Sequence, residues 1–258
     1  MLTVVVRVEK GARPAQTDAL ETAARAVLAI LADERSTGEG AWAEAMTAWQ
    51  DARIRKVVRR ARGAEWRRAE ALPGITVTGT PADGGVTGTP PDGGVTGTAA
   101  DGEVTGTPPD GGVTGTAVDG AVPGSNAVVR VFPPVPLDAV PKDLAKLQVT
   151  GTDFEDPGEL PALEPGVPVL WINPNLEMSS GKAMAQCGHA AQLAWWDLSA
   201  EGRKEWQAAD FALAVRTARP EQWQELLTSG LPVVQDAGFT EVAPGSRTVI
   251  AAHPLLTR

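Results

Sequence analysis

Three polar side chains recur at helical spacing in an otherwise apolar stretch of the chain. They are Lys182, Gln186 and His189, within the sequence MSSGKAMAQCGHAAQLAWW that begins at Met178. Residues spaced by four and then by three positions point to the same side of an α-helix. A polar stripe on such a helix must be satisfied by internal hydrogen bonds or must face a cleft. The spacing therefore predicts a helix with a candidate site along one face, and a purely structural stripe remains the alternative for this helix alone.

A second group of polar residues lies in DAGFTEVAPGSRTVIA, which begins at Asp236. Its glycines, among them Gly238, allow tight turns between two short strands. That arrangement leaves Asp236, Thr240 and Thr248 near the strand ends. Each residue taken singly is an ordinary turn or strand residue, so the argument rests on the two groups together.

Together, GKxxxQxxHA from Gly181 and DAGxTxxxPGxxT from Asp236 resemble the type 2 peptidyl-tRNA hydrolases shared by archaea and eukaryotes. The resemblance extends from about Val167 to Pro254. It implies hydrolysis of the ester between a peptidyl, or N-blocked aminoacyl, group and tRNA, which releases free tRNA for reuse. It also implies peptidyl-tRNA as the partner. No cofactor is expected. The chain departs from the family pattern at INPNLEM, where asparagines stand in place of an arginine and an aspartate.

Ester hydrolysis needs an activated water and a cation or donor for the developing oxyanion. On the resemblance we assign Lys182 to the oxyanion or the ribose oxygen, and Asp236 to holding Lys182 or orienting water. The implied catalytic residues are Lys182, Asp236, Thr240 and Thr248, and the implied substrate-positioning residues are Gln186, His189, Gly181 and Gly238.

Three other functions are alternatives to hydrolysis of peptidyl-tRNA. Gly181 and Lys182 near a helix start are also typical of a phosphate-binding loop, but Leu176 stands where that motif needs glycine, and Ala183 where it needs Ser or Thr. A nucleoside triphosphatase is thereby excluded. A non-catalytic tRNA- or peptide-binding module on the same fold, and a hydrolase of another ester or amide, stay open.

A long internal repeat indicates how these residues are supported. Ala48–Trp66 aligns without gaps on Glu205–Trp223, and similar strands and helices flank both copies. We therefore expect an α/β fold, a three-layer α/β/α arrangement with a small mixed sheet, duplicated in tandem as β-α-β-α-β-β units. The expected domains are a degenerate hydrolase-like copy at 1–150, a linker at 151–168 and a catalytic domain at 167–258. The copies would form a pseudo-dimer within the chain, and a homodimer is also possible.

A nine-residue unit beginning VTGT repeats five times from Val77. It has almost nothing large to bury, and prolines interrupt it, so residues 77–126 are expected to form a disordered insert in the first copy rather than a calcium-binding β-roll.

The net charge of −9 is unevenly distributed. Residues 151–258 carry 7 Lys and Arg against 14 Asp and Glu, whereas Arg53–Arg68 carries eight basic residues and one acidic residue. Because tRNA binding depends on phosphate neutralisation, we predict that this basic stretch holds RNA, although a solvated charged face is the alternative. The predicted RNA-binding residues are Arg53, Arg55, Lys56, Arg59, Arg60 and Arg62.

Composition sets the remaining expectations. No apolar run is long enough to cross a bilayer, and MLTVVVRVEK has the pattern of a strand rather than a signal peptide. The single cysteine, Cys187, fits a reducing cytoplasm, and one cysteine with two histidines is too few for a Cys/His zinc site. We therefore expect a cytoplasmic protein without membrane attachment or metal.

Overall fold

The computed structural model describes residues 1–51, 55–79 and 125–256 of the 258-residue chain. The first half contains β1 (Leu2–Arg7), α1 (Gln16–Ala32), α2 (Ala43–Gln50), β2 (Lys56–Ala61), α3 (Gly63–Glu70), β3 (Ile75–Thr78), β4 (Val128–Val131) and α4 (Lys142–Ala145). The second half contains β5 (Val169–Ile172), α5 (Ser180–Asp197), α6 (Ala200–Ala208), β6 (Ala214–Thr217), α7 (Pro220–Thr228), β7 (Val233–Gln235) and β8 (Arg247–Ala252). Single-turn 3-10 helices lie at Glu34–Ser36, Leu137–Ala139 and Pro254–Leu256.

The two halves build sheets with the same strand order. The first sheet runs β2-β1-β4-β3 and the second β6-β5-β8-β7. In each, the first strand pairs in parallel with the strand that follows the helices, and the other pairings are antiparallel. The predicted α/β class with two tandem mixed sheets is confirmed. Each half also has a short helix, α2 or α6, that the predicted unit lacked.

Equivalent tryptophans make equivalent hydrogen bonds in the two halves. Trp49 of α2 donates its indole N–H to the carbonyl of Arg55 at 3.2 Å, and Trp206 of α6 donates to the carbonyl of Ala212 at 2.9 Å. Both bonds reach six residues ahead, and both rings are buried. The gapless repeat therefore corresponds to a repeated local structure.

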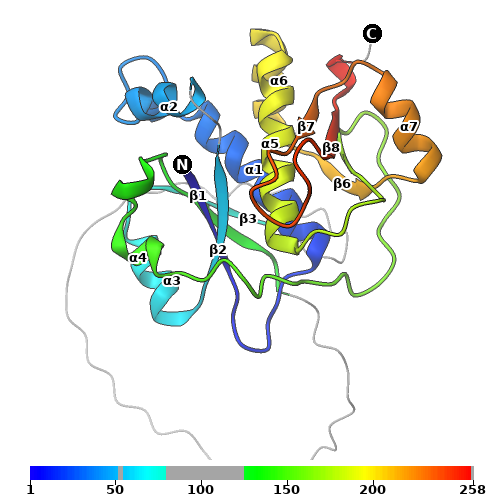
Figure 1. The fold of residues 1–258 in the computed structure, drawn as a ribbon. Coiled ribbons are helices and arrows are strands. Elements are labelled where there is room, and N and C mark those ends of the chain that lie inside the picture. The colour runs from blue at the N-terminus through cyan, green and yellow to red at the C-terminus, as the bar shows by residue number, and fades with distance from the viewer. Residues whose placement is uncertain (52–54, 80–124, 257–258) are drawn as a thin grey trace, which may run out of the picture.

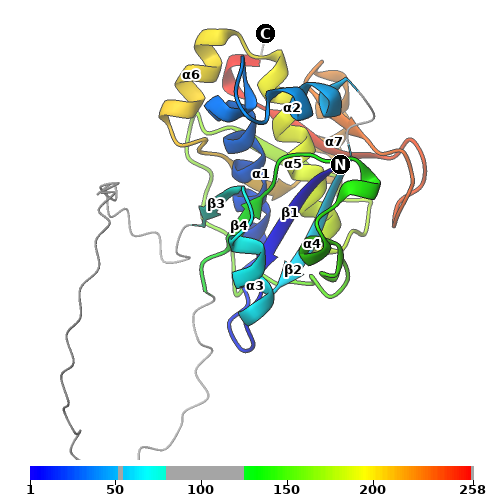
Figure 2. The same cartoon turned by 90° about the vertical axis from the view of Figure 1, so that its left-hand side faces the viewer.

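Helices α1 and α5 pack against each other between the two sheets (Figure 1). Their contact is close because small residues line it. A Cβ atom at Gly188 would lie 2.8 Å from the Val27 side chain, so only glycine fits there without a shift. Leu28 of α1 and Met184 of α5 belong to one core that contains residues of both sheets. The halves thus share a hydrophobic core, and in Figure 2 strands β1 and β2 of the first sheet lie toward the viewer, in front of α1.

The outer face of each sheet has its own smaller core. Trp66 of α3 packs with Val5 and Phe132 on the first sheet, and Trp223 of α7 packs with Ile250 on the second. Each half is therefore layered helix, sheet, helix.

The segment predicted as a linker, 151–168, lacks regular structure but is anchored to both halves. Ser180 of α5 accepts the amide of Phe154 at 2.9 Å, and the Asp156 carboxylate accepts the amide and hydroxyl of Thr17 at 2.8 and 2.7 Å. Val77 and Thr78, predicted to begin the disordered insert, instead belong to β3 and pair with Val129 and Val128. Residues 80–124 lie outside the described residues, so the predicted disorder of that part stays a prediction. No helix among the described residues combines the length and the apolar composition needed to cross a membrane.

Candidate active site

The start of α5 is fixed by the loop that joins β7 to β8. The Ser179 hydroxyl caps the helix by accepting the amide of Lys182 at 3.2 Å. Ser179 in turn donates its amide and its hydroxyl to the Glu241 carboxylate, at 2.8 and 2.9 Å. These bonds hold the first turn of α5 against the loop, so that Lys182 projects toward the loop residues.

Lys182, Asp236 and Thr240 meet at this junction. The Lys182 ammonium lies 2.7 Å from the Asp236 carboxylate and donates to the Thr240 hydroxyl at 3.2 Å. The Lys182 and Asp236 side chains are only 9% and 11% exposed. The loop between the two strands thus brings together residues separated by more than fifty positions in the chain.

A second set of bonds fixes the Asp236 carboxylate. Gln186 donates its side-chain amide to Asp236 at 2.9 Å, and the buried Thr248 hydroxyl donates to the Gln186 carbonyl at 2.6 Å. The amide of Gly238, a residue with a φ of 75° that favours glycine, donates to the other carboxylate oxygen at 2.8 Å. Thr248 and Gly238 therefore hold the Asp236 carboxylate in place, and neither residue lines the adjacent cavity.

These contacts set the charge of the Asp236 carboxyl. Burial alone would raise its pKa, but the hydrogen bonds from Lys182, the Gly238 amide and Gln186, with the Lys182 charge, outweigh burial and lower the pKa below its ordinary value. Asp236 is consequently ionised at neutral pH.

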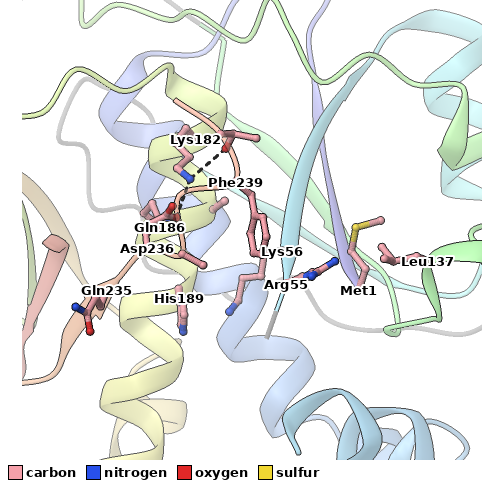
Figure 3. A pocket seen from close by; sticks show the side chains of 13 residues that line it. Met1, Arg55, Lys56, Leu137, Lys182, Gln186, His189, Gln235, Asp236 and Phe239 are labelled. Carbon is pink, nitrogen blue, oxygen red and sulfur yellow. Dashed lines mark hydrogen bonds and ion pairs between the residues drawn. The ribbon is translucent and has the colours of Figure 1, made fainter. Parts of the chain in front are cut away.

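The cluster opens into a cavity of about 580 Å³ between the two halves. In Figure 3, Lys182, Gln186 and His189 extend from α5, Arg55 and Lys56 lie at the start of β2, and the Phe239 ring lies between them. The lining residues are Met1, Arg55, Lys56, Leu137, Lys182, Ala185, Gln186, His189, Gln235, Asp236, Ala237, Phe239 and Thr240. The three residues of the predicted helical stripe thus share one cavity.

His189 is a neutral imidazole in this setting. Burial, followed by the nearby charge of Lys56, lowers its pKa to about 3. It can therefore accept or donate a hydrogen bond near pH 7 but cannot serve as an imidazolium acid.

Comparison with known proteins assigns the second half to a family. The family described as "Peptidyl-tRNA hydrolase PTH2" matches residues 167–257. A protein of Haloquadratum walsbyi named "Peptidyl-tRNA hydrolase" is 34% identical over 87 residues, which cover 31% of this chain and 78% of that relative. The chain belongs to the peptidyl-tRNA hydrolase PTH2 family.

Two eukaryotic relatives of the family are also similar. "Peptidyl-tRNA hydrolase 2, mitochondrial" of Bos taurus is 40% identical over 96 residues, covering 33% of this chain and 54% of the relative. "Probable peptidyl-tRNA hydrolase 2" of Schizosaccharomyces pombe is 36% identical over 96 residues, covering 33% and 47%. The chain thus spans about half the length of these two proteins. The match to the PTH2 family includes Lys182, Asp236 and Thr240 but none of residues 1–150.

The basic residues predicted to bind RNA divide into different environments. Arg55 and Lys56 line the cavity, and Lys56 donates to Gln192. Arg59 and Arg60 instead bind the chain itself: Arg59 donates to the carbonyls of Ala145 and Leu147, and Arg60 to that of Thr150. Arg62 immediately precedes α3, and Arg53 lies outside the described residues.

Gly181 does not line the cavity of this PTH2 family member. A Cβ atom there would lie 2.3 Å from the Thr152 hydroxyl, so its role is to let the 151–168 segment approach α5. The asparagines that depart from the family pattern form hydrogen bonds in the segment between β5 and α5. Asn173 donates to the carbonyl of Arg247 at 2.7 Å and accepts the amide of Asn175 at 2.9 Å.

Sequence reasoning missed several residues of the site. Ser179 could have been found as a helix-capping serine directly before the apolar periodic segment. Glu241 and Phe239 lie inside the quoted loop motif but carry no signal of their own. Met1 and Leu137 reach the cavity only through tertiary packing, and no local pattern marks them.

Proposed function

We propose that this chain hydrolyses the ester between a peptidyl, or N-blocked aminoacyl, group and the terminal ribose of tRNA. The observation that carries this proposal is the cluster of Lys182, Asp236 and Thr240, with contacts of 2.7 and 3.2 Å, at the wall of a cavity. All three lie in the part of the chain that matches the PTH2 family. The names of the relatives agree with this substrate.

In the reaction, water attacks the ester carbonyl carbon, negative charge develops on the carbonyl oxygen, and the ribose oxygen leaves with a proton. Lys182 supplies a positive charge and donors for the oxyanion or the ribose oxygen. Its position is fixed by Asp236, whose own orientation depends on Gln186 and Thr248. Such preorganisation lets the cation act without rearranging as charge develops.

Asp236 is a weak base because its pKa is low. We therefore assign it to holding Lys182 and orienting the attacking water rather than to retaining a proton. The Thr240 hydroxyl, beside the Lys182 ammonium, supplies a further contact to water or substrate. His189 and Gln186 position the substrate, and Gly238 shapes the loop that carries Asp236.

We further propose a division of labour between residues 1–150, as a degenerate copy, and residues 167–258, as the catalytic domain. Arg55, Lys56 and Arg62 are the described basic residues that we assign to the RNA backbone. The repeated strand order and the paired tryptophan bonds support a duplicated origin and a pseudo-dimer within the chain. Arg59 and Arg60 are less available to bind RNA, because their side chains already donate hydrogen bonds to residues 145–150.

The proposed function is tested by release of labelled peptide from a peptidyl-tRNA mimic. The wild type should release peptide, and Lys182→Ala should lower the rate at saturation by about a hundredfold or more. Binding of the same mimic, measured by fluorescence anisotropy, separates the alternatives. Tight binding by the wild type without any release would replace the hydrolase by a tRNA-binding module.

The place of action is a separate proposal. We infer the cytoplasm from the single buried Cys187, whereas the Bos taurus relative carries "mitochondrial" in its name. Cell fractionation with an antibody to the chain decides this point, and recovery with an organelle would contradict the cytoplasmic assignment.

A further inference from the structure

Phe239 is an exposed aromatic ring next to the catalytic cluster. Its residue is 63% exposed, although it lines the cavity. It directly precedes Thr240, whose hydroxyl contacts the Lys182 ammonium. An aromatic side chain of this size normally contributes to the core, so its exposure here, beside the proposed reacting groups, points to a role in binding.

Arg55 faces this ring from the first half of the chain. Its guanidinium carbon lies 4.8 Å from the ring centroid of Phe239. The Arg55 Nε atom is buried and has no hydrogen-bond partner among the described residues, and no described carboxylate forms an ion pair with it. A buried donor without a partner is rare in folded proteins, and a guanidinium is well suited to a phosphate.

We propose that Phe239 and Arg55 form a subsite for the terminal nucleotide of the tRNA, with the base stacked on the Phe239 ring and the phosphate at Arg55. This inference rests on the proposed function, because the ester to be cleaved is attached to the ribose of that nucleotide. The base must then lie one sugar away from the reacting carbonyl. Phe239 and Thr240 are adjacent in the chain and line the same cavity, in agreement with this requirement.

The chemistry of the pair favours a nucleotide over a peptide side chain. Aromatic rings bind unpaired bases by stacking, and arginine adds charge for the backbone. An apolar peptide side chain would cover the Arg55 guanidinium in the cavity without offering it an acceptor, at a cost in desolvation. The subsite also gives the first half a direct part in the site, since Arg55 lies outside the region that matches the PTH2 family.

The test compares binding of adenosine 5′-monophosphate, ribose 5-phosphate and a labelled RNA trinucleotide with a 3′-terminal adenosine. Phe239→Leu keeps an apolar side chain but removes the stacking face, and it should weaken the monophosphate and the trinucleotide about tenfold. Phe239→Trp should restore binding, which also shows that the loop is folded. Arg55→Gln should weaken all three probes, including ribose 5-phosphate. Lys204→Gln, a change of one exposed charge on α6 away from the cavity, should leave all affinities unchanged.

Turnover gives a second readout. On peptidyl-tRNA, Phe239→Leu should raise KM more than it lowers the rate at saturation, because the base contact binds substrate without reaching the ester.

Two results would overturn the subsite: equal nucleotide affinity in wild type and Phe239→Leu, or a change confined to selectivity among peptide side chains. If the wild type released no peptide yet bound nucleotides in the predicted pattern, the proposed function would fail and the subsite would stand.

Discussion

Helices α1 and α5 occupy the same place in the two halves but carry different polar residues. Lys182, Gln186 and His189 are the third, seventh and tenth residues of α5, and Asp18, Thr22 and Arg25 hold those positions in α1. In the second half, the third residue contacts the loop between the last two strands through Asp236 and Thr240.

In the first half the corresponding residues close the base of the hairpin that carries the nonapeptide insert. Asp18 accepts the amide of Ala127 at 2.6 Å, and Arg25 donates to the carbonyl of Thr78 at 2.9 Å. The hydrogen bonds from Asp18 and Arg25 to the hairpin thus go to backbone atoms, whereas those from Lys182 and Gln186 to the second-half loop and strands go to side chains. Equivalent helices therefore bind a hairpin backbone in the first half and a group of charged and hydroxyl side chains in the second half.

Asp236→Asn is expected to have the largest effect. The amide keeps the size of the side chain but removes the charge that fixes Lys182, so the rate of peptide release should fall by about a hundredfold or more. Asp18→Asn removes a charge from the first-half stripe and should leave that rate unchanged. A steady-state assay on peptidyl-tRNA measures both, and equal losses in the two variants would remove the distinction between the halves.

Thr248→Val tests the support behind Asp236. Valine matches the shape of threonine but cannot donate to Gln186, so we expect about a tenfold loss of rate and about 1–2 kcal/mol of stability. Thr3→Val is the matched control in the first half. Thr3 is also a buried threonine, but its hydroxyl has no hydrogen-bond partner within the described segments. That variant should be as stable as the wild type or more so in urea unfolding. The idea fails if the two substitutions destabilise the protein equally.

The basic residues of β2 and its flanks should separate by function. Replacing Arg55 and Arg62 by Gln should raise KM for tRNA-linked substrate several-fold and reduce the salt dependence by about one log–log unit for each phosphate that is no longer neutralised. Arg59→Gln should chiefly lower stability, because Arg59 donates to the carbonyls of Ala145 and Leu147. KM measured at several salt concentrations, with parallel unfolding curves, distinguishes the two. An unchanged salt slope would leave the basic stretch as a solvated face.

The smallest expected effect concerns pH. Both histidines lie in the second half, and burial lowers the pKa of His253 to about 4 and, with the Lys56 charge, that of His189 to about 3. Below about pH 6.5 the unfolded chain therefore binds protons that the folded chain does not, so stability should fall as pH drops toward 5. For His189 the slope approaches about 1.4 kcal/mol per pH unit in that range.

Urea unfolding between pH 7.5 and 5 measures this dependence. His189→Asn and His253→Asn should each make it shallower. The lowered pKa of Asp236 contributes only at lower pH, where its carboxylate gains a proton. A histidine resonance that titrates near pH 6.5 in NMR spectra of the folded protein would contradict the account.

Local patterns in the sequence were sufficient to predict much of this architecture. The spacing of Lys182, Gln186 and His189 predicted a shared helix face, and the repeat of Trp49 and Trp66 at Trp206 and Trp223 predicted two similar units. These predictions were correct because helical periodicity, and the positions of tryptophans within a repeat, can be read from residues close together in the chain.

The cavity itself could not be predicted, because it forms between residues far apart in the chain. Arg55 and Phe239 belong to different halves and meet only in the tertiary structure. The basic pattern of β2 does not reveal that the Arg59 and Arg60 side chains bind carbonyls of residues 145–150. Gly181, assigned to substrate positioning on the resemblance, contacts Thr152 for the same reason.

The most direct test of the central claim compares Lys182→Ala with Asp18→Ala, the same change at the third residue of α5 and of α1. Peptide release from peptidyl-tRNA should be measured at saturating substrate, with thermal unfolding as a check on folding. The account predicts a loss of about a hundredfold or more for Lys182→Ala and a wild-type rate for Asp18→Ala. A wild-type rate in Lys182→Ala would contradict the placement of the catalytic centre in the second half.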